Sequence, residues 1–127
     1  MITRRRSISG GKPSTTGRSR GLAIYLALWT RPEDVEGFER EYSADHIPRA
    51  RELPGLRRLR IATVHDGSFY RAAELEFDSV QELQAALGES EAGERLIENS
   101  RHLQQTYSVT TERIIMDGWS VVAGSSY

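Results

Sequence analysis

Tyr42 and His46 are the residues whose types and spacing most favour chemistry. An imidazole transfers protons near neutral pH, and a phenol hydroxyl can donate a hydrogen bond to a developing oxyanion. Residues four apart share one face of a helix, so both side chains are expected to point into the same cavity. The alternative is structural. His46 would then bond a backbone carbonyl at a helix end, and Tyr42 would be a core residue with a solvated hydroxyl.

Three further residues are expected to bind the substrate beside this pair, namely Phe38, Trp29 and Arg71. Phe38 precedes Tyr42 by four positions and therefore lies on the same helix face. Arg71 falls on the apolar side of a strand predicted over residues 69–77. There its guanidinium would bind a carboxylate or an enolate, or would extend to the rim of the core.

The sequence lacks the residue patterns of several other kinds of site. It contains no cysteine, which excludes disulfides, thiolate nucleophiles and cysteine-based zinc sites. It has no His-x-x-x-His pair of the kind that binds metals, no glycine-rich phosphate loop after a predicted strand, and no Ser-His-acid pattern. His65 and His102 are expected to be exposed. We therefore expect neither a metal nor another cofactor.

A helix over residues 32–47 is expected to present the Tyr42–His46 pair. Pro32 suits the first turn of a helix, and Pro48 cannot continue its hydrogen bonding, so the helix should end or kink near His46. The apolar and aromatic side chains that recur at helical spacing, and so form its core-facing stripe, are Val35, Phe38, Tyr42 and His46.

The remaining pattern alternates strands and helices. Strands are predicted over residues 21–30, 56–65, 69–77 and 107–117, a second helix between a cap at Asp78 or Ser79 and Gly88, and a third helix over 90–105. Asp66-Gly67 predicts a tight hairpin between the second and third strands. The order βαββαβ predicts an α+β ferredoxin-like fold with a four-stranded antiparallel sheet.

The first strand is apolar on both of its faces, which is typical of a strand covered on both sides. One face of the sheet should pack on the helices. Alternation along 69–77 places Tyr70, Glu74 and Glu76 on the other face, where the two glutamates would pair with Arg58 or Arg60. The apolar residues assigned to that same face are Tyr25, Ala27, Trp29, Ile114 and Met116. Because so apolar a face usually meets another subunit, we predict a two-fold homodimer with facing sheets, a dimeric α+β barrel.

Charge divides the chain into a basic leader and an acidic body. Residues 1–20 hold six basic residues and no acid, and they are predicted to be a disordered leader, or alternatively a basic arm that contacts an acidic partner or nucleic acid. Of the 17 basic residues, 11 remain against 18 acidic ones, so the body carries a net charge of −7. This charge argues against nucleic-acid binding by the domain at 21–117.

Length and composition indicate one soluble globular domain, with 127 residues of which 38% are hydrophobic and 28% charged. The longest apolar run, from Leu22 to Trp29, is too short to span a bilayer, so we expect no membrane association and a cytoplasmic location. Residues 118–127 are predicted to form a C-terminal tail that adds a short strand or crosses to a partner subunit.

Two stretches of the sequence resemble the EthD family of dimeric α+β barrel proteins. The first is Phe38-x-x-x-Tyr42-x-x-x-His46-Ile47-Pro48 with the following Leu53-Pro54-Gly55-Leu56, and the second is Ala73-Glu74-Leu75-x-Phe77-Asp78-Ser79 leading into Leu83-x-x-Ala86-Leu87. The resemblance covers about residues 21–117 and implies the dimeric barrel. It also implies that His46 is a signature residue. Related barrels include lactone isomerases, polyketide cyclases, cofactor-free oxygenases and haem-degrading enzymes, so the fold does not choose the reaction.

Two functions are compatible with these residues. In the first, the protein is a small catabolic enzyme that binds a small apolar or aromatic carbonyl compound. His46 moves a proton beside the carbonyl and Tyr42 holds the oxyanion, as isomerisation, cyclisation or cofactor-free oxidation requires. In the second, it is a non-catalytic ligand-binding protein or an accessory subunit of a degradation pathway.

Overall fold

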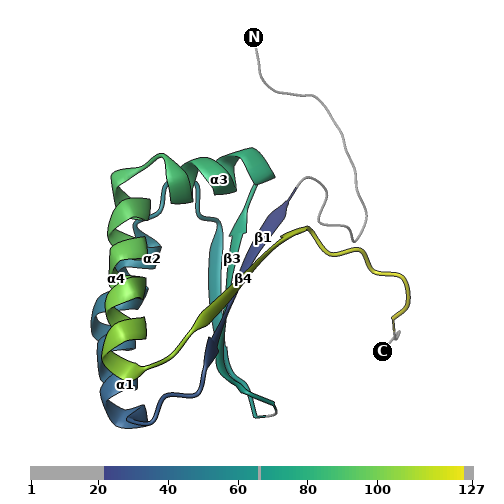
Figure 1. Ribbon diagram of the computed structural model, residues 1–127. Coiled ribbons are helices and arrows are strands. Elements are labelled where there is room, and N and C mark those ends of the chain that lie inside the picture. Colours follow the sequence, from purple (N-terminus) through teal and green to yellow (C-terminus); the bar gives the residue numbers. More distant parts are fainter. Residues whose placement is uncertain (1–21, 66, 125–127) are drawn as a thin grey trace, which may run out of the picture.

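The computed structural model describes residues 22–65 and 67–124. The predicted leader over residues 1–20 and Asp66 of the predicted hairpin pair lie outside the described residues. Figure 1 shows the elements, whose bounds are β1 (Ala23–Thr30), α1 (Val35–Glu41), η2 (Tyr42–His46), α2 (Ile47–Arg51), β2 (Arg58–Thr63), β3 (Phe69–Phe77), α3 (Val80–Gly88), α4 (Glu91–Tyr107) and β4 (Thr111–Asp117).

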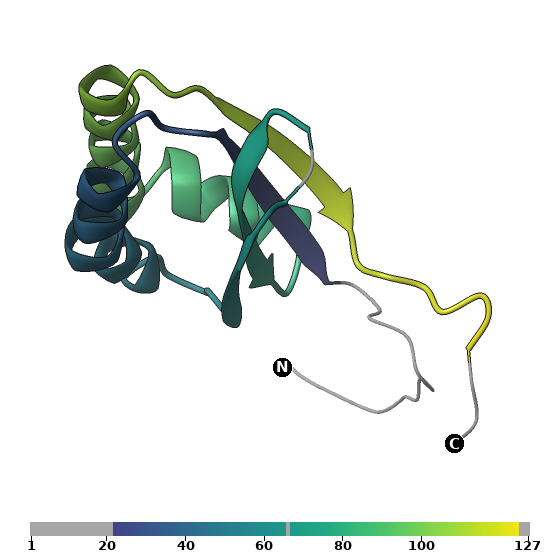
Figure 2. The same cartoon turned by 90° about the horizontal axis from the view of Figure 1, so that it is seen from below.

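The strands form one four-stranded sheet in the order β2-β3-β1-β4, and every neighbouring pair is antiparallel. β1 lies between β3 and β4, with Leu26 opposite both Glu74 and Ile114. This is the topology of the predicted ferredoxin-like α+β fold, which is confirmed. The helices lie on one side of the sheet and leave its other side, hereafter the open face, without a covering layer of helices (Figures 1 and 2). Among the described helices, none is long and apolar enough to cross a membrane.

The assignment of β1 side chains to the two sheet faces was wrong. Trp29 packs edge-on against Phe38 and Tyr42 of the helical layer, with ring centroids 5.8 Å apart in both cases. Tyr25, Ala27 and Trp29 therefore face the helices, and Leu26 lies on the open face opposite Ile114. Because β1 is apolar on both parities, its pattern could not distinguish the two faces. The assignment of Ile114 and Met116 to the open face agrees with the register.

Tyr70 also differs from its predicted position. The pairing of β1 with β3 shifts between Trp29 and Thr30, whose partners are Arg71 and Phe69, so Tyr70 has no partner of its own. An extra residue of this kind bends the strand and re-aims a side chain. Tyr70 consequently lies beside Phe38, with ring centroids 6.2 Å apart, on the helical side of the sheet.

The helix that carries Tyr42 and His46 continues past the predicted break. α1 leads into η2, a π-helical turn, and η2 leads into α2 without an intervening loop. The amide of Ile47 bonds the carbonyl of Tyr42, five residues back, which is the π-helical pattern. Pro48 stands at the start of α2, where its missing amide hydrogen is tolerated. The π turn thus replaces the predicted end or kink, and turns of this type are frequent at functional sites.

The two later helices begin at serine caps. The hydroxyl of Ser79 accepts a hydrogen bond from the amide of Glu82 at 3.1 Å, as one of the predicted caps requires, and Ser90 accepts from Gly93 at 2.9 Å. Gly93 also lets α4 approach α3 closely, because a Cβ atom there would lie 2.2 Å from the carbonyl oxygen of Ala86. The close approach at Gly93 packs the start of α4 against the end of α3.

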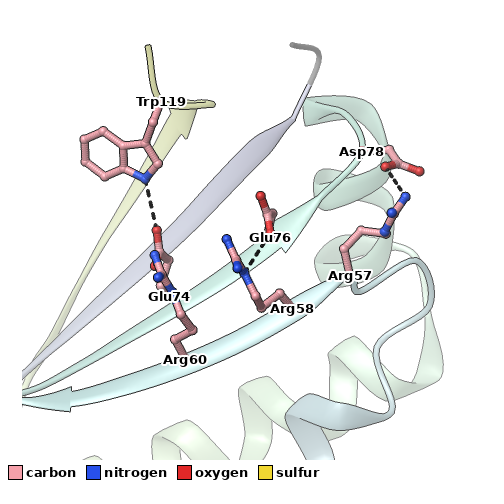
Figure 3. A network of polar contacts seen from close by, with 7 residues as sticks. All are labelled: Arg57, Arg58, Arg60, Glu74, Glu76, Asp78 and Trp119. Atoms are coloured by element: carbon pink, nitrogen blue, oxygen red, sulfur yellow. Dashed lines mark hydrogen bonds and ion pairs between the residues drawn. The ribbon is translucent and has the colours of Figure 1, made fainter. Parts of the chain in front are cut away.

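The open face carries a polar ladder across β2 and β3 (Figure 3), beside apolar residues of β1 and β4. Arg58 pairs with Glu76 at 3.1 Å, and Arg60 pairs with Glu74, as the alternation of the two strands predicted. The described part of the tail, residues 118–124, forms no strand. The indole Nε1 of Trp119, in this tail, donates to the second carboxylate oxygen of Glu74 at 3.2 Å (Figure 3). The Trp119 side chain therefore lies on the open face.

Candidate active site

A cavity of about 290 Å³ lies between the helices and the sheet. All the elements except α1 contribute to its walls, and most of the side chains are apolar. The lining residues from the sheet are Tyr25, Ala27, Trp29, Leu59, Ala73, Leu75, Thr111 and Arg113, and those from the helices are Tyr42, His46, Ile47, Ala50, Leu87, Leu96, Ile97, Ser100, Arg101 and Gln104. The cavity is large enough for a small organic molecule.

His46 lies in the wall of this cavity with only 8% of its surface exposed. Its Nδ1 atom lies 2.8 Å from the side-chain oxygen of Asn99 on α4. An amide oxygen can only accept, so Nδ1 carries the proton and Nε2 keeps its lone pair. Burial lowers the pKa of His46, against the effect of the Asn99 bond, and the positive charge of Arg49 lowers it further. The imidazole is therefore neutral at neutral pH and suited to accept a proton.

Tyr42 lies beside His46 in the same wall. The two rings are stacked, with centroids 5.1 Å apart and an angle of 27° between their planes. Burial raises the pKa of Tyr42 to about 12, and the positive charge of Arg71 only partly opposes this. The hydroxyl therefore keeps its proton and can donate it in a hydrogen bond. It makes no hydrogen bond to any other residue described in the structure.

Two more polar atoms in the cavity walls share this lack of a partner. The indole Nε1 of Trp29 and the hydroxyl of Thr111 are both buried, and neither has a hydrogen-bond partner within residues 22–65 and 67–124. A buried polar atom without a partner costs about 1–3 kcal/mol, so such atoms are usually satisfied by something. With the Tyr42 hydroxyl, they are three buried hydrogen-bonding groups without a partner among the described residues, and all three belong to residues that line the cavity.

Phe38 and Arg71 do not line the cavity, although both were expected to bind the substrate. Phe38 is fully buried behind Tyr42, with the two rings stacked at 5.3 Å. Arg71 is 5% exposed, and its guanidinium lies 4.6 Å from the centre of the Tyr42 ring and pairs with Glu39. Glu39 also accepts from the Tyr70 hydroxyl. Phe38 and Arg71 thus pack against the Tyr42 ring on the side away from the cavity. Trp29 does line the cavity, as expected.

The sequence interpretation placed His65 and His102 outside the site, and both are exposed. It missed Asn99, because a lone asparagine in a long helix carries no motif and only the packing of α4 against η2 brings it to His46. It also missed Thr111, because a single threonine at the start of a strand carries no motif and only the fold brings it to the cavity. Within the described ranges, no three His, Cys, Asp or Glu side chains lie close enough together to hold a metal ion.

Comparison with solved structures places this geometry in a wider context. An EthD family protein from Bacillus halodurans is similar with a TM-score of 0.68 and 23% identity, over 76% of this chain and 97% of that chain. SnoaB, a cofactor-independent oxygenase from Streptomyces nogalater, is similar with a TM-score of 0.62 and 13% identity, over 82% and 99% of the two chains. A dimeric protein of unknown function with a ferredoxin-like fold, from Bacteroides fragilis, gives 0.56 and 8%, over 77% and 97%.

The chain has the ferredoxin-like fold of these proteins. The sequence resemblance to EthD proteins is thereby confirmed at the level of the fold. No model of a protein family matches the chain, and a search of curated proteins finds no relative. At identities of 8% to 23% the likenesses establish architecture, and the reaction must be argued from the site itself.

Proposed function

We propose that this protein is a cofactor-independent enzyme that removes a proton from a carbon next to a carbonyl group of a small organic molecule. The observation that carries the proposal is the Tyr42–His46 pair, in which a neutral base and a protonated tyrosine stand side by side in one wall of one cavity. The likeness to an EthD family protein and to a cofactor-independent oxygenase supports a role in small-molecule metabolism.

The first step follows from the protonation states of the two side chains. Nε2 of His46 accepts the proton, and the electron pair of the broken C–H bond moves into the carbonyl group to form an enolate. The Tyr42 hydroxyl donates a hydrogen bond to the enolate oxygen as its charge develops. Return of the proton from His46 to a different atom of the substrate completes an isomerisation and restores the free enzyme. Enolate formation is also the first step that cyclisation or a cofactor-free oxidation needs.

The walls of the cavity suit this step. Their largely apolar character excludes water and strengthens the hydrogen bond to the developing charge. Asn99 holds the imidazole in one tautomer, and Arg71 stacks behind the Tyr42 ring and keeps it in place. A purely ligand-binding protein would have no need of an oriented base.

The test is a screen of small aromatic and carbonyl compounds for turnover by the wild-type protein and by His46→Ala. We expect at least one compound to be converted, with the rate falling at least about 100-fold in His46→Ala. His102→Ala is the matched control, because His102 is an exposed histidine that does not line the cavity. Compounds that bind without being converted would instead indicate the ligand-binding or accessory role.

We also propose that two copies of the chain pair through their open faces. Leu26 and Ile114 lie opposite each other there, and Ile114 is 39% exposed. An apolar sheet face without a helical cover is suited to a second subunit. Ile114→Glu should therefore shift the protein from dimer to monomer in sedimentation, whereas Val35→Glu, at a similarly exposed residue of α1 on the helical side, should not. A wild-type monomer at high concentration would refute this pairing.

A further inference from the structure

The cavity has charged side chains of only one sign in its walls. The two charged residues that line it are Arg101 of α4 and Arg113 of β4, and no described acidic residue lines it. This is unexpected from composition, because the chain holds 18 acidic residues and its body is acidic overall. A uniformly positive wall in a largely apolar cavity favours a negatively charged occupant.

Both arginines lie where the cavity meets solvent. Each lines the cavity and is also exposed to solvent, so both residues lie at its edge. The hydrogen-bonding groups of Tyr42, Trp29 and Thr111 are buried, on residues that also line the cavity. A molecule in the cavity would thus meet positive charge where the cavity opens to solvent.

These two arginines are also unpaired in the described part of the chain. Arg57, Arg58, Arg60, Arg71 and Arg95 each form an ion pair with a carboxylate, whereas Arg101 and Arg113 form none among the described residues. The other described arginines without an ion pair, Arg31, Arg40, Arg49 and Arg51, do not line the cavity. Arg101 also borders an outer groove that includes Glu94 and Glu98. The negative charges of these two glutamates partly offset the positive potential of Arg101. Arg113 has Tyr25 as its neighbour. On the sheet Arg113 lies opposite Ala27, which also lines the cavity.

We propose that the substrate is an organic acid, an apolar molecule whose carboxylate lies at the entrance between Arg101 and Arg113 while its carbonyl end reaches Tyr42 and His46. This inference rests on the proposed function, because it names the chemical class of the compound that the same cavity takes. A guanidinium offers several donors in a plane and binds a carboxylate in two-point fashion. The carboxylate would orient the molecule and leave its uncharged end in the interior.

The test compares 2-naphthoate with 2-naphthamide, two ligands of the same shape that differ in charge, by isothermal titration calorimetry. The wild-type protein should bind the acid at least about 10-fold more tightly than the amide. In the double variant Arg101→Gln/Arg113→Gln this preference should fall to about twofold or less, and added salt should weaken it in the wild type. Arg51→Gln, at an exposed arginine outside the cavity wall, is the control and should keep the preference.

Each outcome decides between the claims. Equal affinity for the two ligands, no saturable binding of either, or a preference that survives the double variant would overturn the inference. Because the readout is binding, it does not depend on turnover. A charge preference in a protein that converts no compound would retain the inference and count against the proposed reaction. Turnover without a charge preference would support the proposed reaction and count against the inference about the organic acid.

Discussion

The Nδ1 atom of His46 lies 2.8 Å from the side-chain oxygen of Asn99, and this contact joins η2 to α4 across 53 positions of sequence. It fixes which ring nitrogen carries the proton and therefore which one is free to act as a base. Asn99 acts through His46 and does not itself line the cavity, so its part in the proposed reaction is to position the base.

Substituting Asn99 should change the pKa of His46 in opposite directions. Asn99→Ala removes the bond that opposes the effect of burial, so the pKa should fall further. Asn99→Asp places a carboxylate beside the ring, so the pKa should rise. Titration of the imidazole resonances by NMR measures both, with His65 as an exposed internal reference. If the pKa of His46 stayed the same in both variants, the hydrogen bond to Asn99 would not control the basicity of this imidazole.

The buried imidazole should make stability depend on pH. The pKa of His46 is lower in the folded protein than in the unfolded chain, so the unfolded chain binds the proton first as the pH falls. The free energy of unfolding should therefore decrease from about pH 6.5 down to the folded pKa, with a slope of at most about 1.4 kcal/mol per pH unit from this group. Urea unfolding between pH 8 and pH 5 measures it.

His46→Gln should remove that contribution to the pH dependence, whereas His102→Gln should not. His102 is exposed; its Nε2 donates to Glu41 at 2.8 Å, and its Nδ1 lies 3.4 Å from the hydroxyl of Thr106. Identical curves of stability against pH for the wild type and His46→Gln would contradict the assignment of a depressed pKa to this histidine.

Tyr42→Phe should separate stability from activity. The hydroxyl is buried without a partner among the described residues, so its removal should leave the free energy of unfolding unchanged or raise it by up to about 1 kcal/mol. Turnover should nevertheless fall by about 10- to 1000-fold, because the enolate loses its hydrogen-bond donor. Thermal unfolding and steady-state kinetics on one preparation test both. A destabilised variant would mean that the hydroxyl has a structural partner.

Arg71→Met should destabilise the protein by about 1–3 kcal/mol, since it leaves Glu39 without its cation. This loss of unfolding free energy is smaller than for a fully buried ion pair, because the Glu39 side chain is 34% exposed and partly screened by solvent. The double variant Arg71→Met/Glu39→Gln should recover part of the loss. Chemical unfolding of the wild type, Arg71→Met, Glu39→Gln and the double variant gives the coupling, and a double variant less stable than the sum of both single changes would contradict this account.

Local patterns predicted the fold well where each pattern had one interpretation. Leu59 and Arg58 alternate across β2, and their opposite partners Leu75 and Glu76 do the same on β3, so one strand pair could be assigned to faces correctly. The four-residue spacing of Tyr42 and His46 placed both rings in one wall even though the segment is a π turn rather than an α-helix. The spacing survives because both forms put these residues on successive turns.

Other features depend on packing between distant segments. β1 is apolar on both sides, and only its contact with the helical layer decides that Trp29 faces inward. The bulge that turns Tyr70 toward Glu39 leaves no mark in the sequence. Asn99 becomes significant only when α4 lies against η2. The positive cavity entrance likewise combines residues from α4 and β4 that no local motif connects.

Exchange of carbon-bound hydrogen in deuterated water tests the central claim most directly. Proton NMR would follow the loss of the signals next to the carbonyl of 2-tetralone, a small aromatic ketone, with the wild-type protein and with the His46→Gln and His102→Gln variants. The account predicts that the wild type and His102→Gln accelerate exchange over buffer and that His46→Gln does not. Saturable binding of the ketone with an exchange rate that is the same for the wild type and His46→Gln would contradict it.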